Sequence, residues 1–404
     1  MAKNTKPAIR FKGFTDDWEQ RKLGDIAEFN PKAEIPDVFE YVDLESVIGT
    51  EMVSHRQELK LTAPSRAQRL AKTGDLFYQM VRPYQKNNYL YEKSDKHYVF
   101  STGYAQMRPH QDGYFLLCLV QNNNFVQIIL DNCTGTSYPA INANDLANIE
   151  VKYPFKSEEQ VKIGMVFRSL DNLITLHQRK YDSLVNVKKA MLEKMFPKNG
   201  ETVPEIRFKG FTDAWEQRKV TELGKIYIGL VTTMTKHYTE EGTLLIRNSD
   251  IKDGRFEFGD EPIYLETSFA EENSSRMHKL GDVITVHTGD VGTSAVITEN
   301  EINSIGFATI VTRTNQQIIY SEYLCTFLNT EKHKRWAVAI STGDGRTNYN
   351  LGDYFELVVP VPKLDEQKKV ACFIKELNHL ITLHQRKLEK LKNIKKSCLE
   401  KMFV

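Results

Sequence analysis

The residues best suited to chemistry lie in short polar stretches that follow expected strands. In the stretch 82–89, basic, amide and aromatic side chains alternate where a loop is expected. Arginine and lysine can pair with guanine, asparagine and glutamine can pair with adenine, and lysine can also neutralise a phosphate. An ordinary polar loop facing solvent would have a similar composition. The stretch therefore predicts contacts with nucleic acid, made by Arg82, Tyr84, Lys86 and Asn87.

Other polar, glycine-containing stretches supply the remaining candidates for nucleic-acid contacts. The first half of the chain adds the stretch 134–138, and the second half adds the stretches 247–248, 287–294 and 342–350. For any single residue here, a role facing solvent is the simple alternative. The candidates are Thr136, Ser137, Tyr138, Arg247, Asn248, Thr288, Thr293, Arg346, Asn348 and Tyr349.

Motifs for catalysis are largely absent from the sequence. It contains no GxxxxGK[ST] phosphate loop, no HExxH zinc motif, no GxGxxG after an expected strand and no Asn/Asp-Pro-Pro-Tyr/Phe run of the kind that amino-methyltransferases use. One weak pattern remains, because Asp37, Glu58 and Lys60 have a spacing that can hold Mg²⁺ and polarise water in a nuclease. Solvated surface charges are the alternative. We expect no catalytic residue and no metal site in this chain, with a self-contained Mg²⁺-dependent nuclease as the competing hypothesis.

Two long helices must position these loops, and the second helix repeats the first. The stretch 377–403 is a copy of 170–196, displaced by 207 positions, with 18 of 27 residues identical. Apolar residues recur at alternating steps of three and four, which is typical of a coiled coil. The single His177 and His384 fit this apolar seam better than a metal or acid–base role. The expected seam consists of Leu170, Ile174, His177, Tyr181, Leu184, Leu377, Ile381, His384, Leu388 and Leu391.

A second repeat opens each half of the chain. The stretches 9–22 and 206–219 share 13 of 14 residues, whereas the segments that follow them diverge. The chain therefore contains two copies of one frame, and each copy encloses a different insert. Two copies of a frame tend to pack about a pseudo-two-fold axis. We expect an α+β protein with two α/β domains, at 1–155 and 199–362, and two long helices, at 156–198 and 363–404, packed as an antiparallel coiled coil.

The inserts show the local patterns of mixed α and β structure. The opening stretch 9–22 predicts a short strand, a turn at Gly13 and a helix start, with Trp18 buried. Faint matches between the inserts, such as Gly74-Asp75 with Gly281-Asp282, indicate one fold with different loops. Helices are expected at 114–130, 321–329 and 331–340, and strands at 41–48, 75–81, 98–107, 149–153, 244–248, 282–287, 294–297 and 357–361.

Composition narrows the class of protein. The formal net charge of +1 excludes a uniformly basic nucleic-acid binder but allows a local basic surface. The five cysteines include no CxxC pair, so the composition favours a reducing compartment without a zinc site. Apolar runs are too short to cross a bilayer, and the first residues lack a hydrophobic signal core. We therefore expect a cytoplasmic protein without a membrane partner.

The two-copy plan, the LITLHQRK…LEKMF helices, the WEQRK openings and the GD and STG elements together resemble the specificity (S) subunit of type I restriction-modification systems. The resemblance covers essentially the whole chain. It implies that each insert is a target recognition domain that reads one half of a split double-stranded DNA sequence. It also implies that the helices space these domains and dock the modification subunits.

The resemblance further implies that partner subunits carry out adenine methylation, ATP-driven translocation and DNA cleavage. S-adenosylmethionine, ATP and Mg²⁺ would then bind to those methyltransferase and motor-nuclease subunits, and this chain would hold no cofactor. A coiled-coil DNA-binding scaffold or transcription regulator without methylation partners is a further alternative.

Antiparallel helices related by a two-fold axis have a geometric consequence. His177 and His384 lie at the midpoints of the two expected helices, so we expect them within two helical turns of each other, roughly 11 Å. A helix of this length spans roughly 60 Å, which would make the coiled coil a ruler for the spacing of the DNA half-sites.

Overall fold

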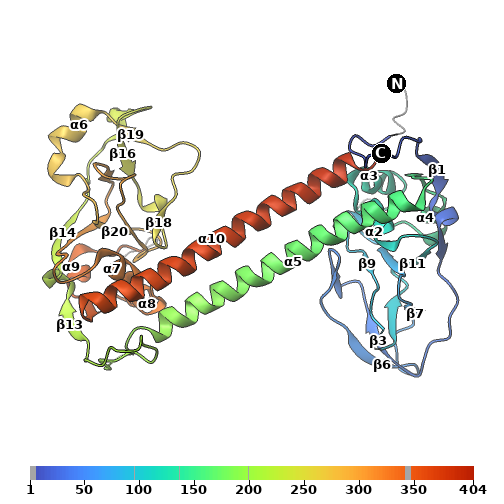
Figure 1. The fold of residues 1–404 in the computed structure, drawn as a ribbon, viewed down its shortest axis with the longest axis horizontal. Coiled ribbons are helices and arrows are strands. Elements are labelled where there is room, and N and C mark those ends of the chain that lie inside the picture. Colours follow the sequence, from blue (N-terminus) through green and yellow to red (C-terminus); the bar gives the residue numbers. More distant parts are fainter. Residues whose placement is uncertain (1–5, 95, 136, 199, 342–346) are drawn as a thin grey trace. The chain divides into compact units, whose positions relative to one another are not determined.

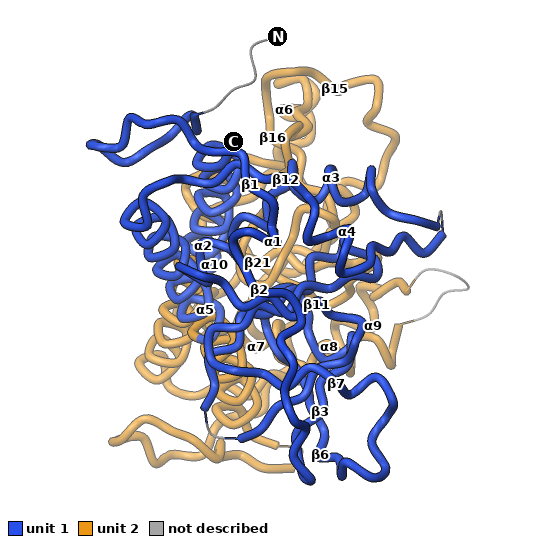
Figure 2. Tube along the Cα trace, turned by 90° about the vertical axis from the view of Figure 1, so that its right-hand side faces the viewer, with its two compact units in different colours: residues 1–179, 385–404 blue, residues 180–384 orange. Residues whose placement is uncertain are grey.

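The computed structural model describes residues 6–94, 96–135, 137–198, 200–341 and 347–404. It divides into two compact units, coloured separately in Figure 2. Unit 1 comprises Met1–Arg179 and Gln385–Val404, and unit 2 comprises Lys180–His384. Each unit therefore contains one insert and part of both long helices, α5 (Ser157–Lys194) and α10 (Leu364–Lys401). The expected boundaries between recognition domains and helices stay a prediction.

The insert of unit 1 is built from two four-stranded sheets (Figure 1). Its helices are α2 (Gly113–Gln121), α3 (Asn123–Asp131) and α4 (Ala143–Asn148). The first sheet has the order β2 (Ala27–Phe29), β11 (Tyr104–Pro109), β8 (Leu76–Gln79), β9 (Tyr89–Leu90). The second has the order β6 (Arg56–Leu59), β3 (Val38–Val42), β10 (Tyr98–Ser101), β7 (Ala67–Leu70), and only β3 and β10 run parallel.

The insert of unit 2 repeats this plan. Its helices are α6 (Thr267–Glu272), α7 (Ser321–Leu328), α8 (Glu331–Ile340) and α9 (Leu351–Phe355). One sheet has the order β14 (Gly224–Ile228), β23 (Ile310–Thr314), β20 (Val283–Thr285), β21 (Ser294–Val296). The other has the order β15 (Tyr238–Thr239), β19 (Tyr264–Leu265), β16 (Thr243–Ile246), β22 (Ile305–Gly306), again with one parallel pair, β16 and β22. The expectation of one fold with different loops is confirmed.

Three expected elements of unit 1 are each divided in the structure. The strand expected at 41–48 is the end of β3 and the short β4 (Val47–Ile48), which pairs with β5 (Glu51–Met52) in a separate sheet. The strand expected at 98–107 is β10 and β11, which belong to different sheets and are separated by a turn at Thr102 and Gly103. The helix expected at 114–130 is α2 and α3, with the break at Asn122. The Asn122 side chain accepts a hydrogen bond from the backbone N–H of Asn124 (2.7 Å) and donates one to the carbonyl oxygen of Leu399 (2.5 Å). It therefore caps α3 and fixes this helix to the end of α10.

The repeated opening segments build the same structure in both units. The strand β1 (Glu19–Lys22) pairs with β12 (Glu150–Tyr153), and β13 (Glu216–Lys219) pairs with β24 (Val358–Val361). Trp18 is buried as expected, but the expected order is wrong, because the strand follows Trp18 instead of preceding Gly13. One turn of helix, α1 (Leu23–Ile26), follows β1.

Each opening segment packs on the end of the long helix that belongs to the other repeat. In unit 1, the N–H of Ile9 donates to the carbonyl oxygen of Lys401 at 2.8 Å, and the rings of Trp18 and Phe403 lie 6.0 Å apart. In unit 2, the N–H of Ile206 donates to the carbonyl oxygen of Lys194 at 2.9 Å, and the rings of Phe196 and Trp215 lie 6.1 Å apart. The two contacts are the same, although one joins neighbouring segments and the other joins segments at opposite ends of the sequence.

A buried ion pair fixes each opening segment to the start of the long helix in its own unit. Arg10 Nε lies 2.6 Å from Glu159 Oε1, and Arg207 Nε lies 2.7 Å from Glu366 Oε1. Both carboxylates are almost completely buried, and each accepts two hydrogen bonds from its arginine. Bidentate pairing of this kind is among the stronger polar contacts in proteins.

The long helices pack together and run antiparallel within each unit. In unit 1, Phe167 contacts Phe403, and Asp171 pairs with Lys395 at 2.6 Å. Residue numbers therefore increase along α5 in the direction in which they decrease along α10. Helix α5 ends four residues before the expected end at 198, and α10 ends three residues before the expected end at 404, because Met195-Phe196 and Met402-Phe403 turn into the cores. In the expected seam, Leu377 and Leu388 are buried, and the other members, Leu170, Ile174, His177, Tyr181, Leu184, Ile381, His384 and Leu391, are half-buried.

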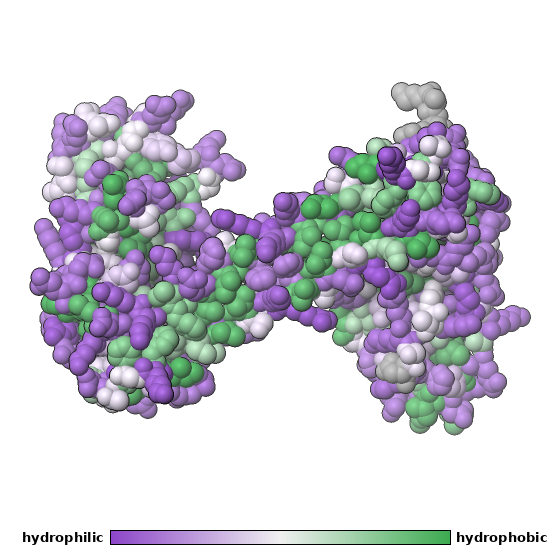
Figure 3. All heavy atoms as spheres, in the orientation of Figure 1, coloured by the Kyte–Doolittle hydropathy of each residue, from purple (hydrophilic) through white to green (hydrophobic). Residues whose placement is uncertain are grey.

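The expected proximity of His177 and His384 stays a prediction, because these residues belong to different units. Beside the seam, four leucines remain exposed: Leu173 and Leu176 on α5 in unit 1, and Leu380 and Leu383 on α10 in unit 2. Figure 3 shows hydrophobic surface along the helices. Among the described residues, no helix combines the length and apolar character needed to cross a membrane. All five cysteines are free thiols.

Two buried histidines predict that unit 2 becomes less stable in acid. Burial lowers the pKa of His278 and the pKa of His333 to about 4. Between about pH 6.5 and pH 4, these two histidines are protonated in the unfolded chain but remain neutral in the folded chain. The free energy of unfolding should therefore fall as the pH drops from about 6.5 to about 4, by up to about 1.4 kcal/mol per pH unit for each histidine. Urea unfolding at pH 7 and pH 5 measures this loss.

The variant His278→Gln isolates the contribution of one histidine to this pH dependence. It should show a smaller loss of stability between pH 7 and pH 5 than the unmodified chain. His379, which is exposed on α10, provides the matched control, and His379→Gln should leave the loss unchanged. An identical pH dependence in both variants would contradict the assignment.

Candidate nucleic-acid interface

In unit 1, two loops carrying predicted contact residues lie side by side. We call residues 80–88, after β8, loop A, and residues 133–140, after α3, loop B. Val81 pairs with Ala140 in a β-bridge, and the N–H of Arg82 donates to the carbonyl oxygen of Pro139 at 2.8 Å. The Arg82 guanidinium lies 4.4 Å from the centre of the Tyr138 ring. The structure therefore joins candidates that are more than fifty positions apart in the sequence.

The candidates of loops A and B differ in how free their side chains are. Tyr84, Ser137 and Tyr138 are exposed. Asn87 uses its side-chain oxygen to accept a hydrogen bond from the N–H of Gly49 at 2.8 Å. Thr136 lies outside the described residues. The exposed side chains are the ones available to a ligand, and Asn87 also orders the loop.

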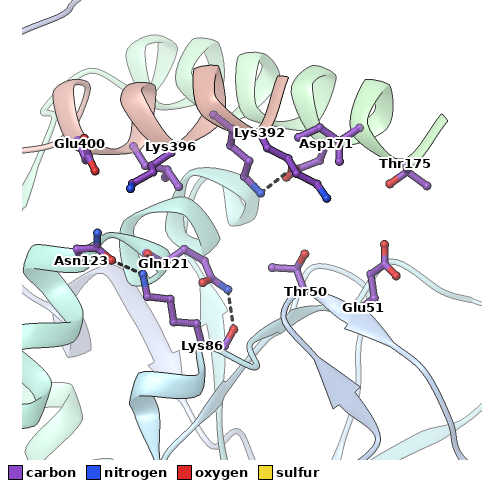
Figure 4. A pocket seen from close by; sticks show the side chains of 13 residues that line it. Thr50, Glu51, Lys86, Gln121, Asn123, Asp171, Thr175, Lys392, Lys396 and Glu400 are labelled. Atoms are coloured by element: carbon purple, nitrogen blue, oxygen red, sulfur yellow. Dashed lines mark hydrogen bonds and ion pairs between the residues drawn. The ribbon is translucent and has the colours of Figure 1, made fainter. Parts of the chain in front are cut away.

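Lys86 is held by the junction of α2 and α3 (Figure 4). Its ammonium donates to the carbonyl oxygen of Gln121 (2.9 Å) and to Asn123 Oδ1 (2.6 Å), and burial lowers its pKa. The Gln121 side chain donates in return to the carbonyl oxygen of Lys86 at 2.9 Å. The geometry therefore gives Lys86 a role in fixing loop A, in addition to any contact with phosphate.

Unit 2 has the equivalent pair of loops. We call residues 286–293, after β20, loop A′, and the described residues 341 and 347–350 loop B′. Thr288 pairs with Asn348 in a β-bridge, and the Thr288 hydroxyl donates to Asn348 Oδ1 at 2.9 Å. Asn248 accepts a hydrogen bond from the N–H of His287 (2.8 Å) and donates to the carbonyl oxygen of Ala308 (3.2 Å). Arg346 lies outside the described residues.

Three candidates of unit 2 are occupied by contacts within the fold. Thr293 is buried and donates to Asp290 Oδ2 at 2.8 Å. Tyr349 is fully buried, with its ring 6.0 Å from that of His333. Arg247 is half-buried and pairs with Asp250 at 2.8 Å. The geometry favours structural roles for all three, whereas Thr288 and Asn348 are partly exposed at the rim of loops A′ and B′.

The sequence interpretation missed a charged cleft in unit 1 beside loop A. This cleft has a volume of about 470 Å³, and its charged lining is four lysines, Lys86, Lys392, Lys395 and Lys396, and three carboxylates, Glu51, Asp171 and Glu400 (Figure 4). Lys395 is neutralised by Asp171, whereas Lys392 and Lys396 are exposed. Two neighbouring lysines on a helix most often face solvent. Their place in a cleft follows only from the position of loop A, which the sequence does not give.

The nuclease hypothesis finds no support in the geometry. The N–H of Lys60 donates to the carbonyl oxygen of Asp37 at 2.9 Å, so the structure does bring these two residues together. However, Glu58 Oε1 accepts a hydrogen bond from Arg56 Nε at 2.9 Å. Within the described ranges, no group of three His, Cys, Asp or Glu side chains could hold a metal ion.

Curated relatives of the chain are specificity subunits. The chain is 22% identical to the MjaVIII specificity subunit of Methanocaldococcus jannaschii over 82% of this chain and 73% of the relative. It is 25% identical to the HindI specificity subunit of Haemophilus influenzae over 45% of this chain and 41% of the relative.

Solved structures share the fold. The S subunit of a type I restriction-modification system from M. genitalium superposes with a TM-score of 0.59 at 14% identity, over 99% of both chains. A chain from a study of the assembly and conformational transition of the type I system gives a TM-score of 0.51 at 21% identity, over 96% of this chain and 97% of the other.

A family model accounts for both halves of the chain. The model for the type I restriction modification DNA specificity domain matches residues 15–186 and again residues 212–393. Each match takes in one insert and most of the long helix that follows it. The chain therefore belongs to the family of type I restriction modification DNA specificity domains, of which it carries two copies.

Proposed function

We propose that this chain is the DNA-recognition subunit of a type I restriction-modification complex and reads a bipartite target, with one half-site for each unit. The observation that carries the proposal is the pair of family domains, which share one four-stranded sheet and the parallel strand pair of the other sheet but differ in their loops. Loops A and B, and loops A′ and B′, occupy equivalent places but carry different side chains. A shared scaffold with different loops suits two unlike DNA sequences.

The chemistry of the complex belongs to partner subunits in this proposal. Methyltransferase subunits would bind S-adenosylmethionine and methylate adenine, and motor-nuclease subunits would use ATP and Mg²⁺ to translocate and cleave DNA. The exposed leucines of α5 and α10 support a docking role for the helices, because exposed apolar groups on a packed helix pair offer surface to another protein. The free thiols fit a reducing cytoplasm.

Selection of DNA from a random pool tests the proposal. The full chain, purified with the methyltransferase subunit of its own system, should enrich two unlike half-sites separated by a spacer without sequence preference. Discrimination against a mismatched base pair should be about 1–3 kcal/mol. One contiguous half-site, or no enriched sequence, would contradict the proposal.

The same protein distinguishes the nuclease alternative. Incubated alone with DNA and Mg²⁺, the chain should leave DNA uncut. Cutting that disappears in the variants Asp37→Asn and Glu58→Gln would establish the nuclease activity instead.

A further inference from the structure

Arg82 occupies a backbone position that suits glycine. Its φ of 53° and ψ of 56° are left-handed, a conformation that carries a steric cost for residues with a Cβ. The match of Gly74-Asp75 with Gly281-Asp282, just before β8 and β20, places Gly289 of loop A′ at the equivalent point, with φ +101°. The backbone contact is also equivalent, because the N–H of Arg82 donates to Pro139 and the N–H of Gly289 donates to Thr347. Unit 1 therefore has a strained arginine where unit 2 has an unstrained glycine. Strain of this kind indicates that the arginine side chain has a function.

The rest of loop A holds this strained position in place. Arg82 and Lys86, which is also left-handed with φ 56°, bracket the single turn Pro83–Gln85. The N–H of Gln85 donates to the carbonyl oxygen of Arg82 at 3.0 Å, and Lys86 is fixed by the α2–α3 junction. Asn88, buried, accepts a hydrogen bond from the N–H of Gln79 at 2.9 Å. Loop A is thus ordered before any ligand binds, so little entropy is lost when Arg82 meets one.

The Arg82 side chain is half-buried beside an exposed aromatic ring. It lies over the ring of Tyr138, whose side chain is 64% exposed. Two other half-buried arginines of the inserts are neutralised, Arg108 by Asp75 and Arg313 by Asp282. Among the described residues, no carboxylate lies within ion-pair distance of Arg82. Stacking on Tyr138 fixes the plane of the guanidinium and leaves its N–H groups free.

We propose that Arg82 reads a guanine in the half-site of unit 1 and that Tyr138 is the positioning residue that holds its guanidinium for this contact. A planar guanidinium donates two parallel hydrogen bonds to guanine O6 and N7 in the major groove, which is the commonest specific contact between a protein and a base. The inference rests on the proposed function and deepens it, because it assigns one base and one side chain to one unit.

Base preference at each position of the selected DNA tests the role of Arg82. The full chain with its methyltransferase subunit should require guanine at one position of the unit 1 half-site. Arg82→Ala should reduce the discrimination at that position by roughly 10- to 100-fold. Arg82→Gln should move the preference toward adenine, because a glutamine amide matches adenine N6 and N7. The unit 2 half-site should remain unchanged in both variants, which shows that they are folded.

Variants of Tyr138 test the positioning role. Tyr138→Phe keeps the ring and should keep the guanine preference, whereas Tyr138→Leu removes the ring and should weaken it. The matched control is Arg21→Gln, which changes an exposed arginine of unit 1 that pairs with Glu19 outside the two loops. This control variant should select the same DNA target as the unmodified chain.

Two results would overturn the assignment. An unchanged unit 1 half-site in Arg82→Ala would remove Arg82 from base reading. An equal loss of affinity for every sequence would make Arg82 a phosphate contact instead. In both cases the unmodified chain still selects a bipartite target, so the proposed function would stand. Failure of the unmodified chain to select such a target would overturn both proposals.

Discussion

Replacing residues 220–362 with the corresponding insert of another family member is expected to change one half of the DNA target and to leave the other half intact. The buried clusters of the second insert form cores of their own, separate from those of the first insert. The exchanged segment begins directly after β13 and includes β24, so the new insert brings its own strand to pair with β13. Several base pairs change at once, and preference for the old half-site should fall by roughly a thousandfold or more. Selection from random DNA, with the methyltransferase subunit present, measures the result.

The reciprocal exchange of residues 23–154 provides the control. It should change the half-site that the first exchange leaves intact, which also assigns each half-site to a unit. A change of both half-sites after either exchange would show that the units do not read DNA independently.

Removing the Glu366 carboxylate should strongly destabilise unit 2. Glu366 is almost fully buried and accepts two hydrogen bonds from Arg207, whose side chain is only 12% exposed. Glu366→Ala leaves the arginine charge buried without a partner, and we expect the free energy of unfolding to fall by about 3–5 kcal/mol. Glu159→Ala should act in the same way on unit 1, through Arg10. Urea unfolding, followed by tryptophan fluorescence, measures both losses.

An exposed ion pair in the same region is the matched control. Lys363 and Asp213 lie 2.5 Å apart but are 76% and 63% exposed. Solvent screens such a pair, so Asp213→Ala should change the stability little. If Glu366→Ala were no more destabilising than this control, the buried pair would not be what fixes the opening segment to α10.

The repeated frame could be predicted from the sequence because its signals are local. Helical periodicity, and a copy displaced by 207 positions, identified α5 and α10 and the pairing of their apolar faces. The break at Asn122 has a weaker signal, the polar run 121–124, in which asparagine is a suitable N-cap. The carbonyl group that holds the Asn122 side chain belongs to Leu399, 277 positions away. A contact of that kind depends on the tertiary fold.

The candidate interface was predictable as a set of loops but not as a set of exposed side chains. Polar residues in a loop can face solvent or fasten the loop, and composition does not distinguish the two. Thr293 and Tyr349 fasten unit 2, whereas Tyr84 and Tyr138 face outward in unit 1. The sequence did not predict the left-handed backbone of Arg82. It does align Arg82 with Gly289, through the match of Gly74-Asp75 with Gly281-Asp282.

The contact between Ile9 and Lys401 bears on the order in which the molecule can be completed during synthesis. Unit 2 obtains the end of α5 from a segment translated just before its own opening strand. The first insert leaves the ribosome first, but Trp18 packs on Phe403, which is translated 385 residues later. The Trp18 surface of the nascent first insert therefore stays uncovered until α10 has been made.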